Sequence, residues 1–337
     1  MLMQNYLCYY PTTIAVVDDS RSFLAMLSKM VPRQQLCRMY SNPHIALQRI
    51  NSVSKYGRQL EDILKNLPID DIDGLETKSK VNVLIDIDFQ RLYQEIYDAK
   101  RFSRISVVLV DYSMPGMNGI EFCRNLKDKT IKKIMITSLA DYRLAVQAFN
   151  EKVIDSFILK NTPNLFAEIN SSIKAAQNDY FKDIYGIGGI LGFVFRSQLP
   201  FDDCDYREFL TLISKKIDFV EYYVLDKAGS ILFLNEQAKP TWLIVKTNDD
   251  LKELYTIARD NNASKSILGA LRNKQAAPIL MSKEDHAISV SNWTMHPLEA
   301  VPSKEGYFYS LITKEIIGSL DHKKIVSFRK YISKKVK

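Results

Sequence analysis

The sequence predicts an α/β protein in which a parallel, doubly wound sheet is followed by a smaller α+β domain. In the first half of the chain, short apolar segments alternate with segments of helical periodicity, which is the pattern of a parallel sheet covered by helices on both faces. In the second half, one helical segment precedes three strands and a further helix, as in α+β domains. The length of 337 residues favours two domains, because single cores rarely grow beyond about 250–300 residues.

The strands and helices of the first domain are expected in strict alternation. The strands are expected at 13–18, 35–40, 105–111, 133–137 and 156–160. The helices are expected at 21–30, 43–50, 120–128, 142–152 and 164–181. Because the strands are nearly continuous apolar runs, each should be buried on both sides.

Polar side chains follow four of these strands at the point where each strand ends. They are Asp18 and Asp19, Asp111, Thr137 and Lys160. Ligands bind at the carboxyl ends of the strands in open α/β sheets, so we expect these side chains to lie together. Each also has a simpler interpretation, since Asp19 or Ser20 could cap the next helix and Asp111 precedes a Pro/Gly turn.

This arrangement, over residues 12–181, resembles the receiver domain of two-component response regulators. The resemblance implies a flavodoxin-like sheet with strand order 2-1-3-4-5. It also implies that Asp111 accepts a phosphoryl group from a sensor histidine kinase, while Asp18 and Asp19 bind Mg²⁺. The family usually has Pro directly after the lysine, whereas here Asn161 and Thr162 intervene, so we expect a longer turn.

The resemblance assigns three further residues to the signalling step. Thr137 would be the hydroxyl switch, Phe157 the aromatic side chain that rotates with it, and Lys160 the cation that binds the phosphate. Phosphorylation would then remodel the face formed by 142–152, 156–160 and 164–181, and drive homodimerisation.

The residue types suit this chemistry. An aspartate can form an acyl phosphate, but three neighbouring carboxylates repel one another unless a cation lies among them. Mg²⁺ prefers oxygen ligands and commonly binds one or two carboxylates, and a backbone carbonyl at Ser113 could complete its shell. Lys160 offers a compact positive charge to the phosphate.

Residues 52–104 are too long for a plain loop of a βα unit, which usually takes about 2–6 residues. We expect a helical insertion here, with helices at 58–66 and 89–99. An acidic turn at 69–74 lacks the first and last ligands of a calcium-binding EF-hand loop. The glycine-rich segment 186–192 follows a helix rather than a strand, so it is expected to be a linker and not a dinucleotide loop.

The expected domain boundaries are 1–183 for the receiver, 184–199 for the linker, 200–320 for the output domain and 321–337 for a basic tail. In the output domain, helices are expected at 205–216, 249–260 (capped by Asn248) and 266–272. Strands are expected at 220–225, 231–234, 242–245, 287–290 and 307–312.

The order of these output elements is shared with a nuclease superfamily, but only as a fold-level analogy. Such enzymes need an acidic residue two positions before a lysine on the third strand, where this chain has Ile244 before Lys246. Asp226 and Glu208 are acidic, but the metal-binding pair is incomplete. A nuclease-like module that binds nucleic acid without cleaving it remains an alternative, as do a phosphorylation-gated enzyme and a protein-binding adaptor.

The receiver, the insertion, the glycine-rich linker and the run 221–230 together resemble the quorum-sensing response regulators of Legionella. That resemblance implies control of cell-density-dependent behaviour by a non-enzymatic output domain. It does not assign an activity to that domain.

The net charge of +7 is concentrated in the tail. Residues 321–337 hold seven Lys/Arg against one Asp. Ile325, Phe328, Ile332 and Val336 form one apolar stripe at helical spacing. The tail could therefore contact nucleic acid, a membrane surface or a partner groove, or dock on its own domain through the stripe.

A cytoplasmic location is expected. The amino terminus has no basic segment before an apolar run, and the apolar stretch 184–195 is too short for the ~20 residues of a membrane-spanning helix. The four cysteines lack C-x-x-C spacing, which is typical of buried thiols in a reducing compartment.

Overall fold

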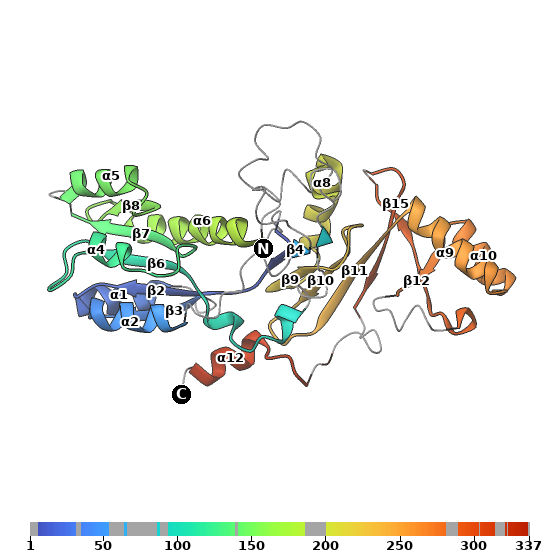
Figure 1. Ribbon diagram of the computed structural model, residues 1–337, viewed down its shortest axis with the longest axis horizontal. Helices are drawn as coiled ribbons and strands as arrows, with labels where there is room; N and C mark the ends of the chain where they lie inside the picture. Colours follow the sequence, from blue (N-terminus) through green and yellow to red (C-terminus); the bar gives the residue numbers. More distant parts are fainter. Residues whose placement is uncertain are drawn as a thin grey trace. The chain divides into compact units, whose positions relative to one another are not determined.

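The computed structural model describes residues 6–31, 35–53, 64–65, 86–87, 94–138, 141–185, 200–280, 289–302, 304–313, 321 and 323–335. The chain forms two compact units (Figure 1). The parallel unit comprises Tyr10–Val81 and Ala99–Gly189, and the antiparallel unit comprises Met1–Tyr9, Asn82–Asp98 and Ile190–Lys337.

The parallel unit contains a five-stranded parallel sheet. Its strands are β2 (Thr13–Val17), β3 (Leu36–Tyr40), β6 (Ile105–Asp111), β7 (Lys132–Thr137) and β8 (Ser156–Leu159). Its helices are α1 (Arg21–Met30), α2 (Pro43–Val53), α4 (Gly119–Arg124), α5 (Tyr142–Asn150) and α6 (Leu165–Tyr185). The strand order β3-β2-β6-β7-β8 confirms the predicted doubly wound, flavodoxin-like sheet.

Helices cover both faces of this sheet because alternate strand residues point to opposite sides. On one face, Val108 and Val110 of β6 pack with side chains of α2, α4 and α5. On the other face, Val107 and Leu109 pack with side chains of α1 and α6. The two-sided core explains why the central strands β2 and β6 are buried along their whole length. The edge strands β3 and β8 are only partly buried, which differs from the expectation that every strand is buried on both sides.

The antiparallel unit contains a six-stranded sheet with the order β1-β9-β10-β11-β15-β14. These strands are β1 (Cys8–Tyr9), β9 (Glu221–Val224), β10 (Ile231–Leu234), β11 (Pro240–Thr247), β14 (Glu299–Ala300) and β15 (Tyr307–Ile312). The predicted meander and final strand are present, and the α+β class of the second domain is confirmed. The 3₁₀ helix η7 (Pro200–Asp202) precedes α8 (Cys204–Ser214), which packs on this sheet through Phe209 and Tyr309, with ring centroids 4.8 Å apart.

A smaller core lies beside the sheet of the antiparallel unit. It is formed by α9 (Asn248–Asp260), α10 (Lys265–Arg272) and the hairpin of β12 (Ala276–Pro278) and β13 (Met295–Pro297). Thr247, not Asn248, caps α9: its hydroxyl accepts a hydrogen bond from the Asp250 backbone, and the Asp250 carboxylate accepts one from the Thr247 backbone. The two reciprocal bonds form a capping box, which explains why the cap lies one residue before the predicted one.

The first strand differs from the predicted boundary. Cys8 and Tyr9 pair antiparallel with Tyr223 and Tyr222 of β9, so this segment belongs to the second sheet although 1–183 was expected in the receiver. Its two residues are too few to show a periodic pattern. The helix α6 also runs to Tyr185, beyond the predicted end at 181.

The insertion and one output strand also differ from expectation. Within the predicted helix 58–66, Leu64–Lys65 is the short strand β4, and a second short strand, β5, is Asp86–Ile87. The described end of the predicted helix 89–99 is the 3₁₀ helix η4 (Glu95–Tyr97), and another, η5, spans Arg101–Ser103. The expected strand 287–290 ends in the 3₁₀ helix η8 (Val290–Asn292). The acidic turn 69–74 and the glycine-rich segment 186–192 lie outside the described residues.

The first part of the apolar stripe in the basic tail packs on its own unit, whereas Ile332 is only partly buried and Val336 lies outside the described residues. Ile325 and Phe328 are buried, and the backbone amide of Arg329, on α12 (Phe328–Lys335), donates a hydrogen bond to the carbonyl of Glu236. Within the tail, Phe328–Lys335 is therefore a packed helix of the antiparallel unit with exposed basic side chains. Among the described residues, no helix has the length and apolarity to cross a membrane.

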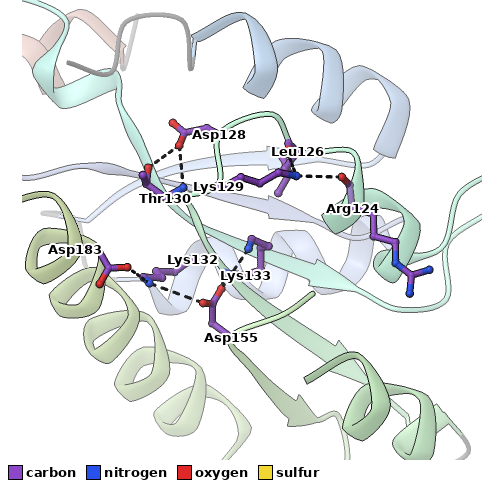
Figure 2. Close-up of polar contacts among 9 residues, drawn as sticks. All are labelled: Arg124, Leu126, Asp128, Lys129, Thr130, Lys132, Lys133, Asp155 and Asp183. Atoms are coloured by element: carbon purple, nitrogen blue, oxygen red, sulfur yellow. Dashed lines mark hydrogen bonds and ion pairs between the residues drawn. The ribbon is translucent and has the colours of Figure 1, made fainter. Parts of the chain in front are cut away.

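Polar contacts at the amino end of β7 fix the position of α6 (Figure 2). Lys132 ion-pairs with Asp183 of α6 and lies 3.9 Å from Asp155, which precedes β8. The backbone amide of Lys133 donates to the Asp155 carboxylate at 2.7 Å. These contacts hold α6, β7 and β8 together at the edge opposite the polar strand ends.

A buried clasp of Arg104, Tyr10 and Tyr185 closes the end of the parallel unit. Arg104 Nη1 donates to the phenol oxygens of Tyr10 (2.6 Å) and Tyr185 (3.2 Å). The guanidinium carbon also lies 5.5 Å from the centre of the Tyr10 ring. The clasp joins the last turn of α6 to the residue that directly follows β1, so it fixes the chain where it passes between the two units.

We expect Arg104→Met to lower the free energy of unfolding of the parallel unit by about 1–3 kcal/mol, because it leaves two buried phenols without a charged donor. Arg143→Met, on the exposed side of α5, is the matched control and should change it by less than about 0.5 kcal/mol. Urea unfolding followed by circular dichroism measures both, and equal effects of the two substitutions would contradict a stabilising clasp.

Candidate functional site

Three carboxylates lie together at the carboxyl end of the parallel sheet. Asp18 and Asp19 directly follow β2, and Asp111 is the last residue of β6. Each offers a carboxylate oxygen within 4.8 Å of the others. Asp18 and Asp111 are buried, at 1% and 4% exposure, whereas Asp19 is exposed. The cluster forms because adjacent parallel strands end at the same edge.

Lys160 places its ammonium group between two of these carboxylates. It directly follows β8, and its backbone amide donates to the carbonyl of Thr137 at 2.9 Å. Its Nζ lies 2.9 Å from Asp111 Oδ1 and 3.3 Å from Asp18 Oδ2. The Phe23 ring, with its centre 5.5 Å from Nζ, supports the cation from α1.

Burial dominates the charge state of Asp111. Burial raises the pKa of this carboxyl above its ordinary value, and Asp18 and Asp19 raise it further, which outweighs the attraction of Lys160. For Lys160, burial lowers the pKa, but the pairing with Asp111 and then Asp18 outweighs burial and raises it. One ammonium group therefore does not balance the three carboxylates.

The loop after Asp111 is shaped by glycines. A Cβ atom on Gly119 would lie 2.5 Å from the carbonyl oxygen of Asp111, so only glycine lets the start of α4 approach the end of β6. Gly116 has a φ of +80°, which glycine adopts without steric strain. The Pro/Gly turn and the terminal aspartate are thus parts of one tight connection.

The structure also places the predicted switch residues. Thr137 ends β7 and is buried, with its hydroxyl donating to the carbonyl of Ser138 at 3.3 Å. Phe157 on β8 is partly buried and makes edge contacts with Tyr142 and Phe149 of α5, at centroid distances of 5.6 and 6.4 Å. Thr137 thus lies at the same sheet edge as the cluster, and the Phe157 side chain packs against α5.

Asp141 was missed by the sequence analysis. Its carboxylate accepts hydrogen bonds from the hydroxyls of Ser113 (3.3 Å) and Ser138 (2.7 Å). It thereby joins the loop that follows Asp111 to the loop that follows Thr137. The sequence signal was only an acidic residue before a helix, which is common at helix starts.

The donor set fits Mg²⁺. Asp18, Asp19 and Asp111 are hard oxygen ligands, and the cluster carries more negative charge than Lys160 neutralises. Mg²⁺ is commonly held by one or two carboxylates with water and phosphate oxygens. The cluster therefore matches the acidic pocket with which receiver domains typically bind this ion.

The acidic residues considered for a nuclease-like site have other surroundings. Asp226, after β9, accepts a hydrogen bond from the Ser230 backbone at 3.0 Å. Burial raises the pKa of Asp226, while the positive charge of Lys246 on β11 lowers it. Glu208 lies on the exposed side of α8.

Comparison with known proteins gives one family match. Residues 85–170 match the response regulator receiver domain. No curated protein matches the sequence.

Among solved structures, the Legionella pneumophila response regulator LqsR is 31% identical, with 99% of this chain and 97% of that chain covered and a TM-score of 0.73. A CheY-like receiver domain protein from Methanospirillum hungatei is 16% identical (51% and 98% covered, TM-score 0.33). The Thermotoga maritima response regulator TrrA is 18% identical (49% and 98% covered, TM-score 0.30).

The raised pKa of Asp111 gives a stability prediction with a definite sign. In metal-free buffer the folded protein holds the Asp111 proton more tightly than the unfolded chain does, so ionisation of this group lowers stability as the pH rises through the folded pKa. We expect Asp111→Asn, which is neutral at every pH, to unfold at a higher temperature than the parent protein at pH 7. The difference should shrink as the pH falls toward 4.

Glu121→Gln removes a carboxylate from the exposed side of α4 and serves as the control. It should leave the melting temperature and its pH dependence nearly unchanged. A lower melting temperature for Asp111→Asn at pH 7 would show that pairing with Lys160 outweighs burial, contrary to this account.

Proposed function

Since the chain belongs to the response regulators, we propose that it is a two-component signalling protein in which Asp111 accepts a phosphoryl group from a sensor histidine kinase. The observation that carries the proposal is the Lys160 ammonium group, 2.9 Å from Asp111 within the carboxylate cluster. A lysine beside a buried aspartate at an open sheet edge can bind the oxygens of an incoming phosphoryl group.

The reaction is a transfer from nitrogen to oxygen. An ionised Asp111 oxygen attacks the phosphorus atom as the bond to the imidazole nitrogen of the kinase phosphohistidine breaks, and that electron pair stays on the imidazole. Asp111 supplies the nucleophile, and Lys160 holds phosphate oxygens in line with it. Such catalysis is mostly positioning and electrostatic stabilisation.

We assign Mg²⁺ binding to Asp18, Asp19, Asp111 and the backbone carbonyl of Ser113. When bound, Mg²⁺ would neutralise carboxylate charge and attract phosphate oxygens. Asp18 is held for this role by the Ser20 backbone amide, which donates to its Oδ1 at 2.8 Å.

Thr137 and Phe157 are assigned to the switch. After phosphorylation, the Thr137 hydroxyl would leave the Ser138 carbonyl and donate to the new phosphate. Phe157 would then turn inward and change its contacts with Tyr142 and Phe149. The surface affected is formed by α5, β8 and α6.

This surface is our proposed homodimer interface. On α5, Tyr142 and Phe149 are large apolar side chains on one side of the helix, with 41% and 47% of their surface exposed. Clustered exposed apolar groups favour association, and their packing depends on Phe157.

We place the protein in the cytoplasm, in a quorum-sensing pathway, with a non-enzymatic output unit. The exposed side chains of Lys323, Lys324, Arg329, Lys330 and Lys334 favour nucleic acid as a partner of the docked tail. The alternatives are a phosphorylation-gated enzyme, a degenerate nuclease-like module and a protein-binding adaptor.

The phosphorylation proposal is tested by labelling with a radioactive small phosphodonor in the presence of Mg²⁺. We expect Asp111→Asn to lose most of the label, and chelation of Mg²⁺ to have a similar effect, because the repulsion among the carboxylates would be unscreened. Asp141→Asn keeps the acceptor and should still be labelled. Undiminished label in Asp111→Asn would remove Asp111 as the acceptor.

The dimer proposal is tested by light scattering before and after phosphorylation. We expect the mass to shift from monomer toward dimer on phosphorylation, and Tyr142→Asp with Phe149→Asp to prevent the shift while leaving labelling intact. Met26→Asp, an exposed apolar position on α1, is the control and should dimerise like the parent. An unchanged mass of the phosphorylated parent protein would contradict the interface.

A further inference from the structure

The helix α10 of the antiparallel unit (Figure 1) has an outer face of unusual composition. Leu271 is buried in the small core, and Ile267 and Leu268 pack against it. The opposite face presents Lys265, Ser266, Gly269, Arg272 and Asn273. These positions follow helical spacing, so they form one stripe, with Gly269 at its centre.

Among the residues that the structure describes, no packing contact explains the glycine on this stripe. A Cβ atom built on Gly269 would meet no atom within 4 Å. Glycine within a helix costs roughly 0.5–1 kcal/mol relative to alanine. Gly269 is itself partly buried, but the space that a side chain would occupy is open, which lets another molecule approach the helix closely there.

The charges around this bare backbone have one sign. From 261 to 275 the chain carries Lys265, Arg272 and Lys274, and has no Asp or Glu. Among the described residues, Lys265 and Arg272 make no ion pair, whereas the α9 cations Lys252 and Arg259 pair with acidic neighbours. Lys265 and Arg272 are separated by about 10 Å along the helix axis. The stripe thus combines two available cations with neutral hydrogen-bonding groups.

A tight, hydrogen-bonded turn connects α9 to α10. Asn262 adopts a positive φ of 55°, and the amide of Ala263 donates to the Ala258 carbonyl at 2.9 Å. The Ser264 hydroxyl then caps α10 by accepting from the Ile267 amide. Two helices joined by a turn of about three to four residues are a common way to present the second helix to DNA.

We propose that the outer face of α10 binds the major groove of double-stranded DNA. Lys265 and Arg272 contact phosphates, Ser266 and Asn273 offer hydrogen bonds, and Gly269 allows the groove to approach the helix. The major groove of B-form DNA admits an α-helix, whereas that of A-form RNA is too narrow. A membrane surface is disfavoured because an interfacial helix inserts large apolar side chains, and this stripe has none.

This site is separate in sequence from the tail α12, and three double variants of the full chain distinguish the two. Lys265→Gln with Arg272→Gln changes α10, Lys252→Gln with Arg259→Gln changes α9, and Lys330→Gln with Lys334→Gln changes α12. Each removes two exposed positive charges from the same unit. Because the three variants lose the same net charge, a difference in DNA affinity between them shows which helix contacts the DNA.

Fluorescence anisotropy with a short random-sequence DNA duplex measures binding of both the unphosphorylated and the phosphodonor-treated protein. We expect the α10 variant to bind at least about tenfold more weakly than the α9 variant. Its slope of log affinity against log salt should be lower by about two, because two phosphate contacts are lost. Equal affinity of the α10 and α9 variants, a loss confined to the α12 variant, or no binding by the parent protein would each overturn the proposal.

Gly269→Ala supplies a test that does not change charge. The melting temperature of this variant should be unchanged or higher, because alanine favours the helical conformation and its methyl group would meet no neighbouring atom. Its affinity for DNA should nevertheless be lower than that of the parent protein. If the Gly269→Ala variant bound DNA as tightly as the parent protein, the proposed close approach of DNA to the helix at Gly269 would be wrong. Equal binding to an RNA duplex of the same sequence would overturn docking in the major groove.

Discussion

Repulsion among three carboxylates at one sheet edge is the constraint on which the functional arrangement depends. Asp18 and Asp111 are buried, and a buried charge is costly unless it is paired. Lys160 pairs with both, so it permits the cluster to form in the folded protein. It leaves an excess of negative charge, which a small divalent cation among the carboxylates would neutralise.

The rest of the parallel unit serves to hold these strand ends in place. Helices cover both faces of the sheet, so water reaches the strands mainly at their ends. At the opposite edge, Lys132 ties Asp183 of α6 to the start of β8, and β8 leads directly to Lys160. The clasp of Arg104 with Tyr10 and Tyr185 continues from α6 to the segment after β1.

The helices and strands that show a regular apolar pattern within their own residues could be predicted from the sequence. The parallel strands and their helices were found within a few residues, because buried strands are apolar on both faces and the helices are amphipathic. The positions of Asp18, Asp111 and Lys160 followed from the rule that parallel strands end at one edge. Their roles in phosphoryl transfer stay proposals, because geometry alone does not measure reactivity.

The features that were missed depend on contacts distant in sequence. β1 contains two residues and is a strand only because β9 lies beside it. Asp141 joins Ser113 and Ser138 across two loops, which no local pattern reveals. The role of Gly269 can be inferred only when the atoms around it are known, because the open space at its side-chain position is not visible in the sequence.

The central claim, that the cluster is a divalent cation site made of Asp18, Asp19 and Asp111, is tested most directly by isothermal titration of Mg²⁺ into the unphosphorylated protein. The account predicts a single Mg²⁺ per chain, with marked weakening in both Asp19→Asn and Asp111→Asn. Asp205→Asn, from an acidic group in the antiparallel unit, should bind Mg²⁺ like the parent. Unchanged affinity in the first two variants, or loss of binding only in the third, would contradict it.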